Sequence, residues 1–317
     1  MRVTRVAGID CGTNSIRLLV ADVHDGALTD VDRRMEVVRL GQGVDQTGRI
    51  APDALDRTLA AAARYAEICS DLGVQRLRFV ATSATRDADN RADFVAGVEA
   101  ALGVTPEVIG GHEEAELSFR GAISTLGGRH PGPFLVVDIG GGSTEIVLGT
   151  TSPVAVASMD VGCVRLTERH LADDPPTSEQ IAAASRDIVA GLDAAGRTVP
   201  FGRATTLVGL AGSVTTVTAH ALDLEEYDAT VIDGTVLPVD RVLTSCRALL
   251  TMSRSRRARL PFMHPGRVDV IGAGALIWSD IVARVRADVG RAGGRLATVV
   301  TSEHDILDGI TLSAAER

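Results

Sequence analysis

Blocks of apolar and polar residues alternate along this chain in a pattern that predicts strands, glycine turns and helices. Apolar residues at helical spacing predict helices over 52–72, 91–102, 110–127, 178–195, 238–252 and 267–286, and a last helix from about 305. Short apolar runs bounded by turn residues predict strands over 28–40, 77–81, 106–109, 154–159, 206–208 and 297–301. This alternation of strands and helices predicts an α/β fold.

Two further blocks share one order: an apolar strand, an aspartate, a turn of glycine and hydroxyl residues, and a second apolar strand. They run from Val6 to Val20 and from Phe134 to Leu148. Three residues correspond one for one in the two blocks: Asp10, Gly12 and Ser15 in the first, and Asp138, Gly140 and Ser143 in the second. Because chance rarely duplicates a loop together with its flanking strands, we expect two similar halves that face each other across a cleft.

The glycine turns predict phosphate-binding hairpins. Glycines let backbone N–H groups turn towards an anion, and hydroxyl side chains add donors. Asp138 cannot bind phosphate directly, since like charges repel. We expect it to hold a hard cation such as Mg²⁺, usually through water, or to orient an attacking water.

Two other polar segments follow predicted strands. The first, 82–90, contains Arg86, which is a candidate phosphate ligand because the carboxyl ends of strands line ligand sites in open α/β sheets. A solvated surface arginine is the commoner alternative. The second, 209–215, is a glycine and hydroxyl loop that opens a helix, where backbone N–H groups favour an anion.

The length of 317 residues and the 45% hydrophobic content predict two domains. A glycine- and proline-rich stretch at 127–133 is the expected linker, giving domains over 1–126 and 127–302. We allow for the final helix, about 303–317, packing back on the first domain. The apolar runs fall short of a membrane span of about 20 residues. The first strand starts by Val3, so we expect a cytoplasmic protein without a signal peptide.

Composition excludes several classes of function. The chain has no lysine, which excludes a Walker A lysine and a pyridoxal Schiff base. Its four cysteines lack metal-binding spacing, and a net charge of −9 argues against general nucleic-acid binding. The densest basic cluster, Arg254 to Arg259, is either a solvated helix face or a surface that receives a polyanion.

Six motifs, taken together and in order, resemble the exopolyphosphatase and guanosine pentaphosphate phosphatase family in its short two-domain form. They are DCGTNSIRLLV at 10–20, TSATRDADN at 82–90, GHEEAELSF at 111–119, DIGGGSTEIV at 138–147, GLAGSVTT at 209–216 and RVDVIGAGALI at 267–277. The resemblance covers essentially the whole chain. It implies two ribonuclease-H-like domains of the actin, sugar-kinase and heat-shock ATPase superfold, with an active-site cleft between them.

The resemblance also implies roles for individual residues. Glu114 matches the catalytic carboxylate that activates the attacking water, and Asp138 and Glu145 match positions that handle Mg²⁺ and water. Asp10, the counterpart of Asp138, is expected at the metal as well. The expected phosphate contacts are Gly12, Thr13, Asn14, Ser15, Arg86, Gly140, Gly141, Gly142, Ser143 and Thr144, with Gly212 and Ser213 from the third loop.

Three functions remain open at this point. The first is a Mg²⁺-dependent exopolyphosphatase, and the second is a phosphatase that removes the 5′-terminal phosphate of pppGpp. The third is a polyphosphate- or alarmone-binding regulator with little turnover. The expected partners are inorganic polyphosphate or guanosine penta- or tetraphosphate, without a membrane or a specific nucleic acid, and a homodimer follows from the resemblance alone.

Overall fold

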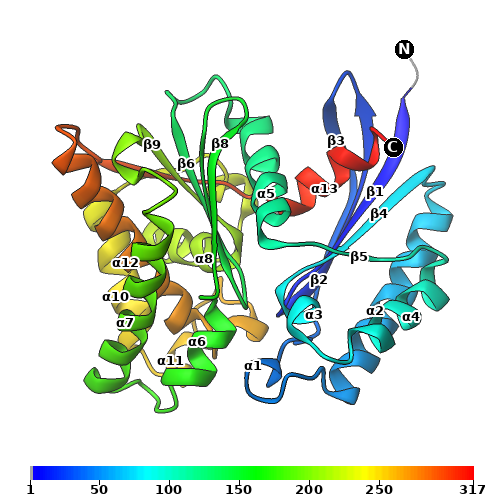
Figure 1. Cartoon of the computed structure of the whole chain (residues 1–317), viewed down its shortest axis with the longest axis horizontal. Coiled ribbons are helices and arrows are strands. Elements are labelled where there is room, and N and C mark those ends of the chain that lie inside the picture. Colours follow the sequence, from blue (N-terminus) through cyan, green and yellow to red (C-terminus); the bar gives the residue numbers. More distant parts are fainter. Residues whose placement is uncertain (1–2) are drawn as a thin grey trace. The chain divides into compact units, whose positions relative to one another are not determined.

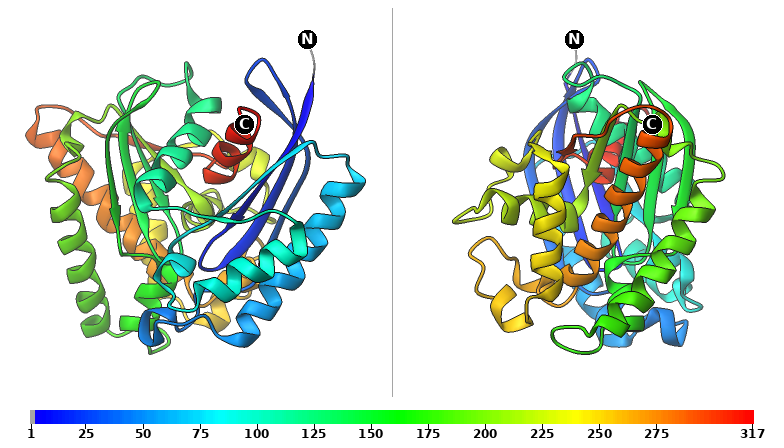
Figure 2. Two further views of the ribbon diagram at one scale, coloured as in Figure 1. Left: turned by 45° about the vertical axis from the view of Figure 1, so that its right-hand side comes forward. Right: turned by 90° about the vertical axis from the view of Figure 1, so that its left-hand side faces the viewer.

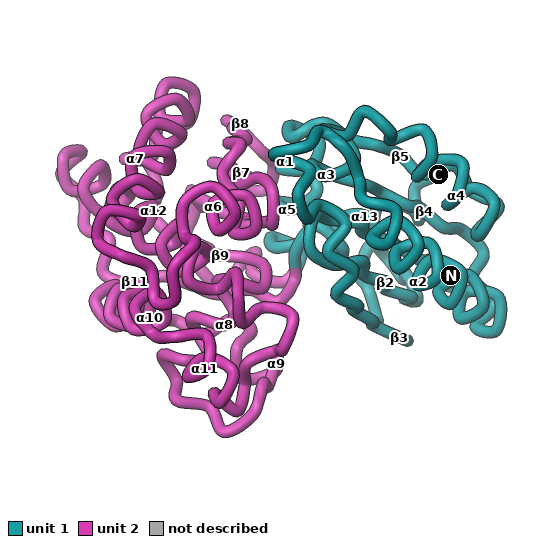
Figure 3. Tube along the Cα trace, turned by 90° about the horizontal axis from the view of Figure 1, so that it is seen from below, with its two compact units in different colours: residues 1–124, 305–317 teal, residues 125–304 magenta. Residues whose placement is uncertain are grey.

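The computed structural model describes residues 3–317, which form two compact units (Figures 1 and 3). Unit 1 comprises the chain up to Ser124 together with Asp305–Arg317, and unit 2 comprises Thr125–His304. Among the described residues, no helix combines the length and the apolar character needed to cross a membrane.

Unit 1 is built on a sheet whose described strands have the order β3-β2-β1-β4-β5. The strands are β1 (Thr4–Cys11), β2 (Ser15–His24), β3 (Ala27–Val37), β4 (Arg76–Ala81) and β5 (Glu107–Val108). The helices are α1 (Val44–Thr47), α2 (Pro52–Asp71), α3 (Ser83–Asp87), α4 (Arg91–Leu102), α5 (Gly111–Leu126) and α13 (Ile306–Ala314). Helices α2 and α4 pack on one another beside the sheet (Figures 1 and 2), and α13 packs on β1 and β4.

Unit 2 is built on a sheet with the order β10-β11-β9-β6-β7-β8 among the described strands. The strands are β6 (Phe134–Ile139), β7 (Thr144–Gly149), β8 (Pro153–Met159), β9 (Thr206–Leu210), β10 (Val236–Pro238) and β11 (Thr298–Thr301). The helices are α6 (Cys163–His170), α7 (Ser178–Ala195), α8 (Ala211–Leu222), α9 (Ala229–Ile232), α10 (Val239–Thr251), α11 (Arg254–Arg257) and α12 (Ile271–Arg291), with 3₁₀ turns at Phe201–Arg203 and Pro265–Arg267. Helix α12 packs along α6, α7, α8 and α10 around a buried core that includes Trp278.

The two sheets repeat one topology, as the duplicated sequence blocks predict. In each, an antiparallel meander of three strands (β1–β2–β3 or β6–β7–β8) is extended beside its first strand by parallel strands (β4–β5 or β9–β11). The registers correspond too, because Asp10 pairs across the strands with Arg17 and Asp138 pairs with Glu145. The predicted α/β fold of two ribonuclease-H-like halves is confirmed.

Helix α13 and its cap residue lie very close to two glycines of unit 1. A Cβ at Gly8 of β1 would lie 2.3 Å from the Thr311 hydroxyl oxygen, and one at Gly121 of α5 would lie 1.8 Å from the Asp305 carbonyl oxygen. Such distances leave no room for a side chain at either glycine. Helix α13 therefore sits directly against strand β1 and helix α5.

The structure differs from the predicted elements at several points. Residues 83–87 form a short helix inside the polar segment 82–90. No loop separates β9 from α8, because the helix begins at Ala211, immediately after the strand ends at Leu210. Helix α12 begins at Ile271 instead of Arg267, since residues 265–267 form a 3₁₀ turn that starts with a proline.

Candidate phosphate and metal site

The two hairpin loops close in the same way. In unit 1 the Gly12 N–H donates to the Ser15 carbonyl at 3.0 Å, and in unit 2 the Gly140 N–H donates to the Ser143 carbonyl at 3.0 Å. Gly12, Asn14 and Ser15 are partly exposed, so this first loop presents backbone and polar atoms at its surface. The duplication seen in the sequence is thus a duplication of loop geometry.

Helix α6 orients the loop of the second hairpin. The Gly140 carbonyl accepts from the Cys163 N–H at 3.0 Å, and the Gly141 carbonyl accepts from the Val164 N–H at 2.9 Å. The Gly142 carbonyl accepts from the Arg165 Nε at 2.7 Å. In a trans peptide the N–H points opposite to the C=O. The N–H groups of the next three residues therefore point away from α6, in the arrangement that an anion-binding loop requires.

The hydroxyls of this loop have different environments. The Ser143 side chain is buried, and its oxygen has no hydrogen-bond partner among the described residues. A buried hydroxyl without a partner is costly, and a ligand oxygen would satisfy it. The Thr144 hydroxyl donates to the Val161 carbonyl at 2.6 Å and is fully buried. The Thr144 hydroxyl therefore already has a partner within the fold, while the phosphate contact expected of this residue stays a prediction.

Two buried carboxylates lie side by side on this hairpin. Asp138 and Glu145 are cross-strand partners, with exposed fractions of 7% and 2%. Glu145 Oε1 accepts a hydrogen bond from the Ser158 hydroxyl at 2.8 Å, and Ser158 is the cross-strand partner of Glu145 on β8. Hard oxygen donors of this kind suit Mg²⁺, which usually takes one or two carboxylates and completes its shell with water and phosphate. The described residues contain no group of three or more metal-ligating side chains.

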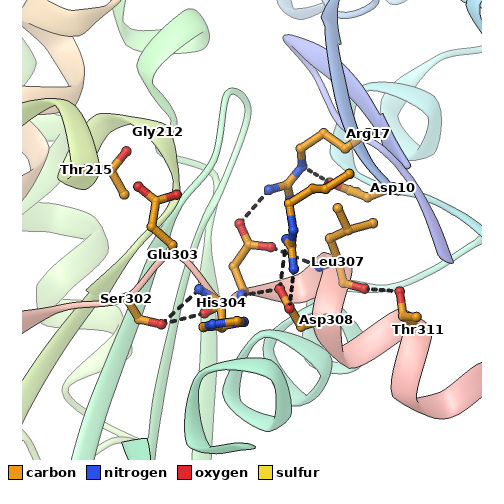
Figure 4. Close-up of polar contacts among 12 residues, drawn as sticks. Asp10, Arg17, Gly212, Thr215, Ser302, Glu303, His304, Leu307, Asp308 and Thr311 are labelled. Atoms are coloured by element: carbon orange, nitrogen blue, oxygen red, sulfur yellow. Dashed lines mark hydrogen bonds and ion pairs between the residues drawn. The ribbon is translucent and has the colours of Figure 1, made fainter. Parts of the chain in front are cut away.

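The equivalent aspartate of unit 1 has a different partner. Asp10 Oδ2 accepts from Arg17 Nε at 2.9 Å and from Arg17 Nη2 at 2.6 Å (Figure 4). Arg17 Nη1 donates to Asp305 Oδ2 at 2.5 Å. Burial raises the pKa of Asp10, and Arg17 opposes that rise. Since the Asp10 charge is already compensated by a guanidinium, the geometry supports Asp138 and Glu145 as metal ligands better than it supports Asp10.

Thr13 belongs to the support of the first loop. Its side chain is buried, and its hydroxyl lies 2.9 Å from the Ser83 hydroxyl of α3. Its carbonyl accepts from the Gly41 N–H at 2.8 Å. The Thr13 side chain and carbonyl therefore already have partners in unit 1, while its phosphate contact stays a prediction.

Unit 1 brings Arg86 and Glu114 together, although they were predicted from separate motifs. Arg86 Nη1 donates to Glu114 Oε2 at 3.3 Å and to the Ile109 carbonyl at 3.1 Å. Glu114 is buried in the first turn of α5, with 8% of its surface exposed. Its neighbours face other partners: Glu113 pairs with the buried Arg78 at 2.6 Å, and Glu116 pairs with His112 at 3.6 Å. Only the middle carboxylate of this acidic run faces Arg86.

Arg86 also lines a pocket of about 540 Å³. Its walls include Arg91, Val95 and Glu99 of α4 and residues 108–110. The pocket lining therefore combines two arginines and a glutamate with apolar side chains.

A third cluster lies at the start of α8. Ala211 has a φ of 65°, a backbone conformation that residues other than glycine rarely adopt. Arg267 Nη1 donates to the Gly212 carbonyl at 3.0 Å, and a Cβ at Gly212 would lie 2.1 Å from the Arg267 Cζ. Ser213 is buried, and a Cβ at Gly274 would lie 2.2 Å from its hydroxyl oxygen. The two last motifs of the chain thus pack directly against each other.

Three residues at these sites were not predicted from the sequence: Arg17, Ser158 and Arg267. Arg17 and Arg267 lie within quoted motifs, and Arg17 follows Asp10 by the same spacing that separates Glu145 from Asp138. That shared spacing could have identified Arg17 as the cross-strand partner of Asp10. No local pattern pointed to Ser158.

Comparison with known proteins decides the family. The sequence pattern of the Ppx/GppA phosphatase family matches residues 19–294. The chain belongs to this family. Exopolyphosphatase 2 of Mycobacterium tuberculosis (strain ATCC 25618 / H37Rv) is 52% identical to it over 324 residues, which cover 99% of this chain and 100% of that protein. The resemblance inferred from the six motifs is confirmed.

Solved structures agree with this assignment. The crystal structure of an exopolyphosphatase-like protein is 48% identical, with a TM-score of 0.95 and coverage of 99% of both chains. The Ppx/GppA family member of Aquifex aeolicus is 28% identical, with a TM-score of 0.81, covering 99% of this chain and 98% of its own. These members of the family share the fold described above.

Proposed function

We propose that this protein is an exopolyphosphatase, which releases terminal orthophosphate from inorganic polyphosphate by hydrolysis. The observation that carries the proposal is the second hairpin. Helix α6 holds the three glycine carbonyls of this loop, so that the loop N–H groups point the other way, and the buried Ser143 hydroxyl adds a donor that has no hydrogen-bond partner among residues 3–317. The 52% identity to a protein named Exopolyphosphatase 2 supports the same substrate class.

The proposed reaction transfers a phosphoryl group to water. Glu114 orients the water and accepts its proton, and the oxygen attacks the terminal phosphorus in line while the bond to the bridging oxygen breaks. Phosphoryl transfer of this kind depends mainly on positioning and on electrostatic stabilisation of the transition state. Arg86 holds one oxygen of Glu114, which fixes the direction of the carboxylate.

We propose Mg²⁺ as the cofactor, bound by Asp138 and Glu145. The adjacent, buried carboxylates and the Ser158 hydrogen bond supply hard oxygen atoms with a supported orientation, which fits this ion. When bound, Mg²⁺ would offset the negative charge on the phosphate oxygens. The proposed phosphate contacts remain the first loop, Gly140 to Ser143, Arg86, and the Gly212 and Ser213 turn.

One observation favours testing a second substrate. The pocket beside Arg86 combines the guanidinium groups of Arg86 and Arg91 with the apolar side chain of Val95. A nucleoside with attached phosphates needs both kinds of surface. The 5′-terminal phosphate of pppGpp is therefore the alternative substrate, and a regulator that binds without turnover is the third possibility.

We also propose that the protein works in the cytoplasm as a homodimer. All four cysteines are free and buried, as is usual for proteins of reducing compartments. The homodimer follows from the resemblance alone, and light scattering coupled to size-exclusion chromatography tests it directly.

Phosphate release from long polyphosphate, short polyphosphate, pppGpp and ATP, with Mg²⁺ and with a chelator, tests these functions. We expect the fastest release from polyphosphate and loss of release with the chelator. Faster release from pppGpp than from any polyphosphate would replace the first function with the second. Binding of polyphosphate without release would favour the regulator.

A further inference from the structure

The chain passes from unit 2 back to unit 1 in a short segment in which consecutive residues are tied by hydrogen bonds. We call residues 302–308 the return segment; His304 is the last residue of unit 2 and Asp305 the first of unit 1. The Ser302 N–H donates to the Gly209 carbonyl at 3.1 Å. The Ser302 hydroxyl accepts from the His304 N–H at 3.0 Å and donates to the His304 carbonyl at 2.9 Å (Figure 4). These hydrogen bonds hold the backbone of residues 302–304 beside strand β9.

Glu303 connects this segment with the turn before α8. Its Oε1 accepts from the Tyr227 hydroxyl at 2.6 Å, and the same hydroxyl lies 2.7 Å from the Thr215 hydroxyl. Thr215 is in the first turns of α8, three residues after Gly212. Burial and the charge of Glu303 raise the pKa of Tyr227, so the phenol keeps its proton and donates it. The Glu303 N–H donates to Asp233 Oδ1 at 3.0 Å, which fixes the backbone as well.

Asp305 connects the same segment with the first hairpin. Its Oδ2 accepts from Arg17 Nη1 at 2.5 Å, and Arg17 binds Asp10 Oδ2 through its other nitrogens (Figure 4). Asp305 also caps α13, but it does so with its other oxygen, Oδ1, which accepts from the Leu307 N–H at 3.0 Å. Capping alone needs one oxygen. The ion pair with Arg17 is therefore additional to the cap.

A second ion pair supports the Asp305 end. The Asp305 N–H donates to Asp308 Oδ2 at 3.0 Å, which completes a capping box, and Asp308 binds Arg33 of β3 at 2.6 Å. Asp305 and Asp308 are both buried, with exposed fractions of 3% and 1%. Buried charges are retained only where they are paired, and here each aspartate faces an arginine.

We propose that the return segment positions two phosphate-binding loops, the turn at Gly212 through Glu303 and Tyr227, and the first hairpin through Asp305 and Arg17. Each connection lies within one unit, so each carboxylate positions the loop of its own unit. Glu303, Asp305 and Tyr227 act as positioning residues in this proposal, which rests on the proposed function of the loops.

Hydrogen–deuterium exchange of the protein without substrate tests the proposal, with two variants that remove one anchor each. Tyr227→Phe removes only the bridging hydroxyl. Asp305→Asn keeps an oxygen for the α13 cap, since asparagine caps helices as well as aspartate does, and removes the charge that faces Arg17. The control is Glu316→Gln, which breaks an exposed ion pair with Arg120 in unit 1.

We expect Tyr227→Phe to exchange faster than wild type in the loop peptide 209–216 and Asp305→Asn to exchange faster in the loop peptide 10–17, while the control matches wild type in both. If either variant exchanges at the wild-type rate in the loop of its own unit, that contact does not position the loop and the proposal is wrong. Because no substrate is present, this result does not depend on whether polyphosphate is hydrolysed.

Steady-state kinetics supply a readout that a purely structural role would not change. If polyphosphate is the substrate, Asp305→Asn should lower kcat by about 10- to 100-fold through misplacement of the first hairpin. Because the variant also removes one of the two carboxylates that face the partly buried Arg17, its thermal unfolding midpoint should fall, and kcat is compared at a temperature at which both proteins are fully folded. A wild-type kcat would contradict the positioning role, whereas a wild-type enzyme inactive on polyphosphate would instead refute the proposed function.

Discussion

Asp10 and Asp138 occupy matching positions in the duplicated hairpins, but their cross-strand partners carry opposite charges. Arg17 neutralises Asp10, whereas Glu145 doubles the negative charge beside Asp138. A divalent cation is attracted to a pair of carboxylates and not to a carboxylate held by a guanidinium. The residue seven positions after the aspartate thus distinguishes the proposed metal site from an ion-paired aspartate.

Ser158 allows a test of the Glu145 assignment. Ser158→Ala removes the hydroxyl that donates to Glu145 Oε1, so the carboxylate loses an orienting hydrogen bond. Loss of such a partner behind a metal ligand typically weakens metal binding by 10- to 100-fold, so we expect the Mg²⁺ concentration for half-maximal activity to rise by about tenfold. Ser152→Ala, at an exposed serine just before β8, is the control. An unchanged Mg²⁺ dependence in Ser158→Ala would show that Ser158 does not support a metal ligand.

At the scale of elements, the basic cluster at α11 divides into two kinds of arginine. Arg257 is buried and donates to the Leu249, Leu250 and Val268 carbonyls, at 2.8, 3.0 and 3.3 Å. It satisfies carbonyls at the end of α10, which have no partner within that helix. Arg254, Arg256 and Arg259 are exposed. Any surface for a polyanion here therefore consists of these three residues, and the sequence could not separate them from Arg257.

Unfolding of two variants measures this difference. Arg257→Ala leaves three carbonyls without a charged donor, so the free energy of unfolding should fall by about 2–4 kcal/mol. Arg256→Ala, at an exposed position, should change it by less than about 0.5 kcal/mol. Urea denaturation followed by circular dichroism gives both values. Equal losses in the two variants would contradict the structural role of Arg257.

At the scale of the whole molecule, the repeated fold and most elements could be predicted from the sequence. Local pattern suffices for helices such as α4 and α7, whose observed bounds match the predicted ones. It fails where contacts between distant residues decide the structure. The Arg17–Asp305 ion pair joins residues 288 positions apart, and the Thr144 hydroxyl is taken by a carbonyl from another segment. No periodicity in the chain reports such contacts.

The central claim is that Glu114 activates the water that hydrolyses polyphosphate. Its most direct test is orthophosphate release from long polyphosphate with Mg²⁺, by wild type, Glu114→Gln and Glu113→Gln. Glu113 is the control because it pairs with Arg78 and not with Arg86.

Loss of a general base should slow release by Glu114→Gln by about 10²- to 10⁴-fold, with polyphosphate binding retained. Glu113→Gln should release phosphate at nearly the wild-type rate. Release by Glu114→Gln at the wild-type rate would contradict the account.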